Sequence, residues 1–142
     1  MISLTRNATR YVSKLSNKLR RKLDTLFPKQ EFSGSQGRTL HFLLAQNRDI
    51  FQKDIEEEYS LRPSTATELL KQMEKNGLIV REPVPYDNRL KKIVLTEKAL
   101  LYRQQVVKDL TDLEKALVKG IPQKDLEVFF DVMEKMMDNL SE

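Results

Sequence analysis

The stretch of sequence that decides the fold is residues 52–96, which read QKDIEEEYSLRPSTATELLKQMEKNGLIVREPVPYDNRLKKIVLT. Apolar residues at helical spacing predict a short helix over residues 52–59. After a break at residues 60–62, Pro63 opens a second helix, because its missing N–H is no loss at the first helical position. Gly77 ends that helix, since glycine readily adopts the left-handed conformation that follows a helix end.

The spacing of apolar residues changes after this helix pair. Leu78-Ile79-Val80 and Ile93-Val94-Leu95 are short, apolar and rich in β-branched residues, with a polar segment containing two prolines between them. Two such runs predict a β-hairpin, with a loop longer than the tightest turns. We therefore expect residues 33–96 to form a winged helix-turn-helix lobe, mainly α with a small β-hairpin wing.

Amphipathic helices flank this lobe. Residues 8–26 carry apolar residues at steps of three and four, and Pro28 ends the helix that they predict. Thr96 is a good N-cap for one long helix, which Gly120 ends. The buried stripe of the long helix is expected to comprise Leu100, Val106, Leu110, Leu113 and Leu117. The last helix presents one broad apolar face, formed by Leu126, Phe129, Phe130, Met133, Met136, Met137 and Leu140.

These flanking helices have apolar faces but little surface in one chain on which to bury them. A second copy of the chain is the natural partner for such faces. We therefore predict a homodimer, with residues 1–32 as an N-terminal dimerisation helix and residues 97–142 as C-terminal dimerisation helices.

The second helix of a helix-turn-helix can enter a major groove with its first residues at the base edges. The candidate DNA-binding residues on this helix are Ser64, Thr65, Thr67, Lys71 and Gln72. Hydroxyl groups both donate and accept hydrogen bonds, and Lys71 lies one turn beyond Thr67 on the same face. An ordinary helix start, where small hydroxyl residues are common, is the competing interpretation.

The hairpin supplies a second candidate contact with DNA. Arg89 is predicted at the turn, where its side chain can reach a narrow minor groove. Asp87 can fix the guanidinium by a bidentate hydrogen bond before DNA arrives, and Lys91 and Lys92 add positive charge on the returning strand. A surface ion pair worth about 0–1 kcal/mol is the competing interpretation.

At this point the sequence resembles the MarR family of bacterial regulators. The matching segments are Gln52–Glu56, Pro63–Thr67, Leu70, Met73–Ile79, Arg81, Asp87–Arg89 and Val94–Lys98. The resemblance is close over residues 36–102. It implies a triangular homodimer joined by the first helix and the last two, in which each recognition helix enters a major groove and each wing the adjacent minor groove.

The chain departs from the family pattern at a few positions. Many members have Arg or Lys where this chain has Glu68 and Gln72, so the family's base contacts cannot be transferred. Arg62 stands where a Ser or Thr cap is common, which places a cation near the DNA and adds Arg62 to the candidate contacts. Ala99 replaces a frequent glycine, a change that concerns helix geometry.

The resemblance also implies a cleft for a small effector, between the dimer-forming helices and the DNA-binding lobe. The candidate ligand-binding residues are Arg38, His41, Phe42 and Tyr102. A mostly apolar cleft with a few polar or cationic groups suits a small aromatic anion. The competing interpretation is that the cleft is closed and the protein has no effector.

The composition excludes several classes of function. The 142 residues include no Cys, one His, no glycine-rich phosphate loop and no ligand set at metal-binding spacing. We therefore expect no enzyme, catalytic residue, metal or cofactor. The longest apolar run, residues 42–45, is too short to span a bilayer, and the absence of Cys favours a cytoplasmic protein.

Charge distribution keeps two functions open. Residues 1–38 hold nine Lys/Arg against two Asp/Glu, in a chain whose net charge is +4, and such an excess suits a polyanionic partner. One function is a DNA-binding repressor, either ligand-responsive or constitutive. The other is a winged-helix module for protein contacts alone, with the basic N-terminal helix binding an acidic partner. Asp87 and Arg89 favour the first, since a module that binds only proteins has no need for this arginine.

Overall fold

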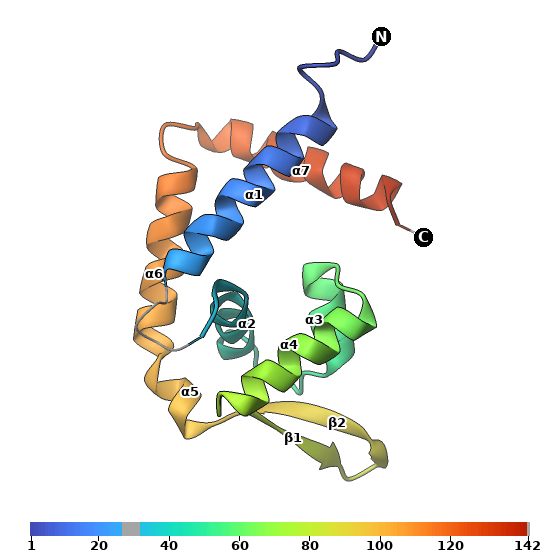
Figure 1. The fold of residues 1–142 in the computed structure, drawn as a ribbon, viewed down its shortest axis with the longest axis vertical. Coiled ribbons are helices and arrows are strands. Elements are labelled where there is room, and N and C mark those ends of the chain that lie inside the picture. Colours follow the sequence, from blue (N-terminus) through green and yellow to red (C-terminus); the bar gives the residue numbers. More distant parts are fainter. Residues whose placement is uncertain (27–31, 142) are drawn as a thin grey trace. The chain divides into compact units, whose positions relative to one another are not determined.

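The computed structural model of the chain describes residues 1–26 and 32–141. The elements are α1 (Ala8–Leu26), α2 (Gly34–Leu44), α3 (Gln52–Tyr59), α4 (Pro63–Lys75), β1 (Ile79–Val84), β2 (Asp87–Leu95), α5 (Glu97–Leu101), α6 (Arg103–Leu117) and α7 (Gln123–Asn139). The prediction of a mainly α winged helix-turn-helix with a β-hairpin is confirmed (Figure 1). The chain divides into two compact units, Met1–Asp109 and Leu110–Glu142, with the boundary inside α6.

The core of the first unit forms where α2, α3 and α4 meet. Leu40, Ile55, Ala66, Leu70 and Met73 come from these three helices, and none of them has any exposed surface. Burying one large aliphatic side chain contributes about 1.5–3 kcal/mol to folding. These contacts fix α4 on the lobe and determine which of its faces is exposed.

The backbone breaks that separate the helices have clear local causes. Ser60 has φ 51° and ψ 47°, in the left-handed region, and turns the chain between α3 and α4. Pro63 occupies the first turn of α4, as predicted. Gly77 follows α4 with φ 74°, a conformation that favours glycine. Thr96 caps α5 by accepting a hydrogen bond from the Ala99 N–H at 3.1 Å.

Helices α1 and α2 approach each other closely at Gly34. A Cβ atom added there would lie 2.5 Å from the Leu23 carbonyl carbon and 2.6 Å from the Leu23 carbonyl oxygen. Ser33 caps α2 through its side chain, so the helix begins at the point of contact. A residue without a side chain therefore allows the two helix backbones to meet.

The prediction of one long helix after Thr96 is wrong, because the helix is interrupted at Tyr102 between α5 and α6. The Tyr102 N–H donates to the Ala99 carbonyl at 3.1 Å, an i to i−3 bond that tightens the backbone. The Tyr102 ring packs edge-on against Phe32, with ring centroids 5.1 Å apart.

The predicted buried stripe of this segment also differs from the structure. Val106 is fully buried, whereas Leu100 and Leu117 are 49% and 41% exposed. The spacing of apolar residues was read correctly as helical, but helical spacing alone did not show which of these residues are buried.

In the second unit, α7 follows a turn at Gly120, where φ is 79°. No residue of α7 is buried in this described segment. Phe129 and Phe130 contact each other, with ring centroids 5.7 Å apart, yet each is 44% exposed. Within residues 1–26 and 32–141, no helix has the length and apolar character needed to cross a membrane.

Candidate nucleic-acid interface

The outer face of α4 is polar. Its core-facing residues leave the opposite side of the helix in solvent, and the exposed polar residues there include Ser64, Thr65, Glu68, Lys71, Gln72 and Lys75. The Gln72 amide donates to the Glu68 carboxylate at 3.0 Å. Among the predicted contacts on this helix, Ser64, Thr65, Lys71 and Gln72 thus share one exposed surface.

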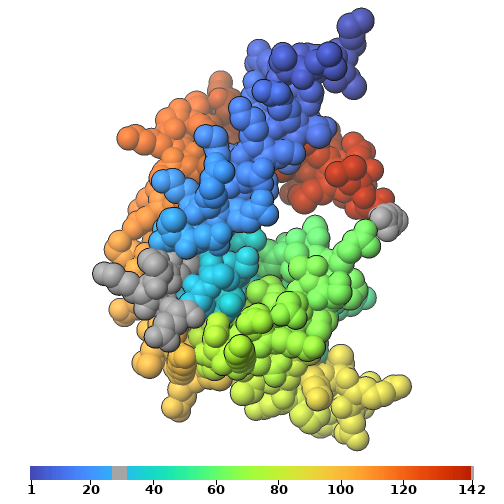
Figure 2. All heavy atoms as spheres, in the orientation of Figure 1, coloured from blue at the N-terminus to red at the C-terminus, as the bar shows by residue number. Residues whose placement is uncertain are grey.

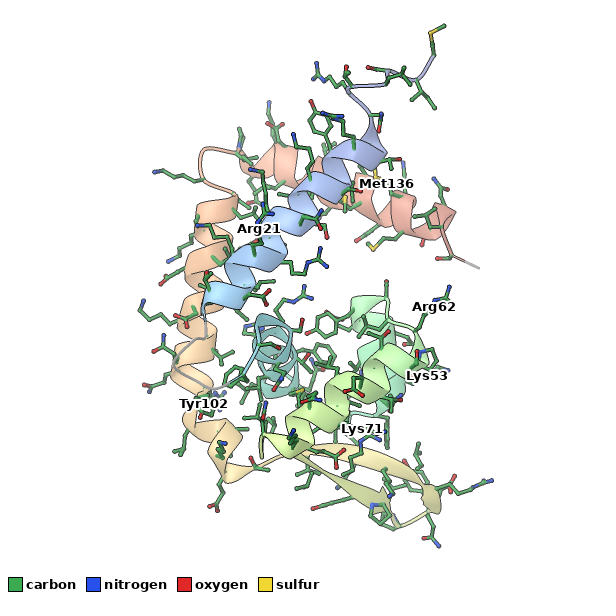
Figure 3. The ribbon with its side chains drawn as sticks, in the orientation of Figure 1. Arg21, Lys53, Arg62, Lys71, Tyr102 and Met136 are labelled. Atoms are coloured by element: carbon green, nitrogen blue, oxygen red, sulfur yellow. The ribbon has the colours of Figure 1, made fainter. Side chains whose placement is uncertain are left out.

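Arg62 immediately precedes this surface. It occupies the N-cap position of α4 without a side-chain capping bond, as its departure from the usual Ser or Thr predicted. Its side chain is exposed, as are those of Lys53 on α3 and Lys71 on α4 (Figure 3). The helix pair therefore presents cations beside the hydroxyl and amide groups of α4.

Thr67 differs from the other candidates on α4 because its hydroxyl is engaged inside the lobe. It donates to the Pro63 carbonyl at 2.8 Å. It also accepts from the Gln52 side-chain amide at 2.9 Å. Thr67 is half-buried, so its position favours an internal role over a base contact.

The wing is longer and its turn tighter than the sequence predicted. β1 and β2 are joined by the two residues Pro85 and Tyr86, so the prediction of a longer loop is wrong. Asp87 and Arg89 lie in β2 instead of in the turn. Figure 2 shows the hairpin, in yellow, protruding from the lobe.

An irregularity in the strand pairing sets Arg89 apart from the ladder. Pro83 pairs with Lys91 and Val84 with Asp87, which leaves residues 88–90 without partners in β1. Proline has no N–H to donate to a ladder and is tolerated at such bulges. Arg89 therefore projects from a bulge next to the turn, and its side chain is 92% exposed.

Asp87 holds Arg89 in the way expected, with one difference. A single carboxylate oxygen, Oδ1, accepts from the Arg89 backbone N–H at 2.9 Å and from its Nε–H at 3.3 Å. The prediction of a bidentate guanidinium bond is therefore wrong, because only the Nε of the guanidinium bonds Asp87 and it shares the single oxygen Oδ1 with the backbone N–H. The terminal nitrogens of Arg89 are left available for another partner.

The base of the wing is attached to the lobe at several points. The Ile93 N–H donates to the Ile50 carbonyl at 2.7 Å, which adds a one-residue bridge to the hairpin. Lys92 lies 3.9 Å from the Asp49 carboxylate, so part of its charge is already paired. Lys91 is exposed and extends the positive surface around Arg89.

The MarR family model matches residues 33–91. These residues belong to the MarR family. The matched range covers the helix-turn-helix and most of the wing, and the family consists of transcriptional regulators and not of enzymes. The resemblance predicted from the sequence is thereby confirmed.

One curated protein is similar to part of the chain. An uncharacterized HTH-type transcriptional regulator of Bacillus subtilis, YdgJ, is 24% identical over 99 residues, which cover 70% of this chain and 60% of YdgJ. The match thus spans less than two thirds of that relative.

Solved structures match over more of the chain. The transcription regulator MarR from Oenococcus oeni PSU-1 is 25% identical, with a TM-score of 0.84, over 93% of this chain and 99% of that one. S. aureus MepR in its DNA-binding conformation is 25% identical, with a TM-score of 0.82, over 95% of this chain and 100% of that one.

The predicted effector residues do not all lie together. Arg38 and Phe42 both contact Tyr59: the Arg38 guanidinium carbon is 5.1 Å from the ring centroid, and the Phe42 ring packs edge-on at 6.2 Å. Tyr102 instead contacts Phe32, and His41 is exposed.

A cavity of about 280 Å³ adjoins Arg38 and Tyr59 and is also lined by Thr65, Glu68 and Gln72 of α4. The Tyr59 hydroxyl donates to the Arg38 carbonyl at 2.9 Å. Burial raises the pKa of Tyr59 to about 12, although the nearby Arg38 charge opposes this shift. Among the described residues, the Arg38 Nε is buried without a hydrogen-bond partner.

Sequence reasoning assigned no role to Gln52 or Arg81, although both lay in the segments that carried the resemblance. The Arg81 Nη2 donates to the Gln52 Oε1 at 3.0 Å. A signal was present, because Arg81 follows buried Ile79 by two residues and so shares its face of the strand. In the described part of the chain, no cluster of three or more His, Cys, Asp or Glu could hold a metal ion.

Proposed function

We propose that this chain is a sequence-specific DNA-binding transcriptional regulator, acting as a homodimeric repressor on a pseudo-palindromic operator. In this proposal α4 enters a major groove and the wing reaches the adjacent minor groove. The observation that carries it is the exposed Arg89, held by Asp87 on a protruding bulge. A similar fold, S. aureus MepR, is described in a DNA-binding conformation, which supports the same use here.

The homodimer is supported by uncovered apolar surface. Exposed large apolar residues include Tyr11, Val12 and Leu15 on α1, and Val128, Phe129, Phe130, Val132 and Met137 on α7. An exposed apolar helix face of this kind commonly marks an interface. In this proposal, residues 1–32 and 97–142 form the dimer interface, and residues 33–96 bind DNA.

The test is binding to the DNA upstream of the chain's own gene, followed by fluorescence anisotropy at several salt concentrations. A specific complex should have half-sites about 10 bp apart. Its affinity should fall with salt at a log–log slope near −0.9 for each phosphate neutralised. Absence of duplex binding even at about 50 mM salt, where phosphate contacts are strong, would contradict the proposal and favour the protein-contact module.

We further propose that a small aromatic anion releases the operator. The cavity beside Arg38 and Tyr59 supports this, since it adjoins α4 and contains a cationic side chain with an unpaired Nε. A ligand releases DNA only if it binds the DNA-incompetent form more tightly. Phenolic and carboxylic aromatics should be titrated against the operator complex, and Arg38→Ala should blunt the response. A full response in Arg38→Ala would show that Arg38 does not bind the ligand. Alanine variants of the other predicted ligand-binding residues, His41, Phe42 and Tyr102, should be tested for the same loss of response.

A further inference from the structure

The side-chain amide of Gln52 joins three elements of the DNA-binding lobe. Gln52 is the first residue of α3. Its Nε2 donates to the Thr67 hydroxyl at 2.9 Å and lies 3.2 Å from the Pro63 carbonyl, both on α4. Its Oε1 accepts from Arg81 on β1 at 3.0 Å. The Gln52 side chain thus bonds the start of the proposed recognition helix through its Nε2 and a wing strand through its Oε1.

Arg81 makes a second connection between the same elements. Its Nε lies 3.6 Å from the Glu74 carboxylate on α4. The Arg81 side chain is 24% exposed, so its charge interacts in an environment partly shielded from water. Arg81 therefore contacts α4 directly near the end of the helix and indirectly, through Gln52, near its start.

We infer that Gln52 is a positioning residue, which fixes the separation and angle between α4 and the wing so that both bind DNA as one unit. The inference rests on the proposed function. If α4 and the wing bind adjacent grooves, the distance between them must match the distance between those grooves. A wing held in place before binding loses less conformational entropy in the complex than a wing that moves freely.

The same geometry gives Thr67 a different role from the one its sequence position predicted. Its hydroxyl donates to Pro63 and accepts from Gln52, so two of its hydrogen-bonding positions are used within the lobe. In this role, the Thr67 hydroxyl accepts a hydrogen bond from the Gln52 side-chain amide and makes no contact with a base.

The first test is a double-mutant cycle on operator affinity, measured by fluorescence anisotropy. Gln52→Ala should weaken operator binding about three- to tenfold, the effect of losing one or two hydrogen bonds. The decisive quantity is the effect of Arg89→Ala in the two backgrounds. We expect Arg89→Ala to weaken binding at least about threefold less in Gln52→Ala than in the parent, because coupled residues are not additive. Equal effects in both backgrounds would overturn the inference.

Two variants separate the halves of the connection. Gln52→Glu keeps an acceptor for Arg81, but its carboxylate cannot donate to the Pro63 carbonyl and faces the Glu56 carboxylate, which lies 3.2 Å from Nε2 in the parent. Thr67 can donate to this carboxylate only by giving up its own bond to Pro63, so Gln52→Glu should weaken the connection to α4 and retain the one to β1. Thr67→Val should weaken binding in the parent but add little in Gln52→Ala, whereas Thr67→Ser should restore affinity. An undiminished Thr67→Val effect in Gln52→Ala would mean that Thr67 contacts DNA and that its assigned role is wrong.

The matched control is Gln46→Ala. Gln46 is also half-buried and donates its amide to a carbonyl, that of Phe42 at 3.0 Å, but within its own segment. Gln46→Ala should leave operator affinity within about twofold of the parent, as expected for a substitution away from the interface. A loss equal to that of Gln52→Ala would show that general destabilisation explains both, and would overturn the inference.

Hydrogen–deuterium exchange on the free protein separates this inference from the proposed function. Gln52→Ala should accelerate exchange in residues 79–84 and at the start of α4, while Gln46→Ala should not. If the parent protein binds no operator, the proposed function fails, and exchange still reports whether Gln52 holds the wing to α4. Unchanged exchange in Gln52→Ala would overturn the inference even for a protein that binds DNA.

Discussion

Replacing Arg89 by alanine tests the proposed interface at its most exposed point. In the free protein, Arg89 is 92% exposed and bonds only to Asp87 among the described residues. A surface ion pair of this kind contributes about 0–1 kcal/mol, so the free energy of unfolding should hardly change. In the complex, a groove contact by an arginine contributes about 1–3 kcal/mol. Arg89→Ala should therefore weaken operator binding by about 5- to 150-fold.

Salt dependence distinguishes a contact with DNA from an indirect effect. If the Arg89 guanidinium displaces one condensed counterion, Arg89→Ala should make the log–log salt slope shallower by about 0.9. Arg89→Lys should preserve the slope but lose affinity, because lysine keeps the charge and lacks the planar fork of donors.

Substitutions of Asp87 complete the design. Asp87→Ala removes the acceptor for both the backbone N–H and the Nε–H of Arg89, yet it also removes a negative charge near DNA. We therefore expect a smaller loss than for Arg89→Ala. Asp87→Asn retains an oxygen acceptor and should lie between the parent and Asp87→Ala. Anisotropy titrations at matched salt measure all four variants, and unchanged operator affinity in Arg89→Ala and Asp87→Ala would refute the reasoning.

Three further outcomes follow from the structure. Gly34→Ala should lower the free energy of unfolding by about 1–3 kcal/mol, because the new Cβ would lie 2.5 Å from the Leu23 carbonyl carbon; an unchanged denaturation midpoint would contradict this close approach. Tyr59 should ionise with a pKa of about 12, so ultraviolet titration should reveal a late phenol that Tyr59→Phe abolishes. Since the folded pKa exceeds the unfolded value, this group's contribution to stability is complete below about pH 10 and is lost as the pH rises towards about 12. Deleting residues 123–142 should abolish the dimer in sedimentation experiments, and a well-folded, soluble monomer would show that the apolar face of α7 is no interface.

Local signals in the sequence predicted the helix-turn-helix because each boundary has a local cause. Pro63 and Gly77 delimit α4 through backbone restrictions that a single residue imposes. The length of the wing's strands was harder to predict, because Pro83 and Pro85 argue against a strand in this segment. A bulge and a two-residue turn tolerate these prolines, and neither feature has a strong signal in one sequence.

The contacts around the candidate site depend on residues that are distant in sequence. Gln52 reaches Thr67 and Arg81, and Tyr59 reaches Arg38. Helical and strand periods predict the face on which a residue lies, but they do not predict which side chain of another element it meets. This is why the polar surface of α4 was found from the sequence and the bonding of Thr67 was not.

The charge on α4 separates two requirements of the proposed function. Phosphate contacts supply affinity and base contacts supply specificity. Glu68 is repelled by phosphate but can accept from the cytosine amino group, and Gln72 can bond adenine; the two side chains already bond each other at 3.0 Å. In the proposed function, the cations that attract phosphate include Arg62 and Lys71, which are exposed beside this pair, and Arg89 on the wing. If affinity depends on the wing in this way, the inferred role of Gln52 in fixing the wing relative to α4 becomes part of recognition.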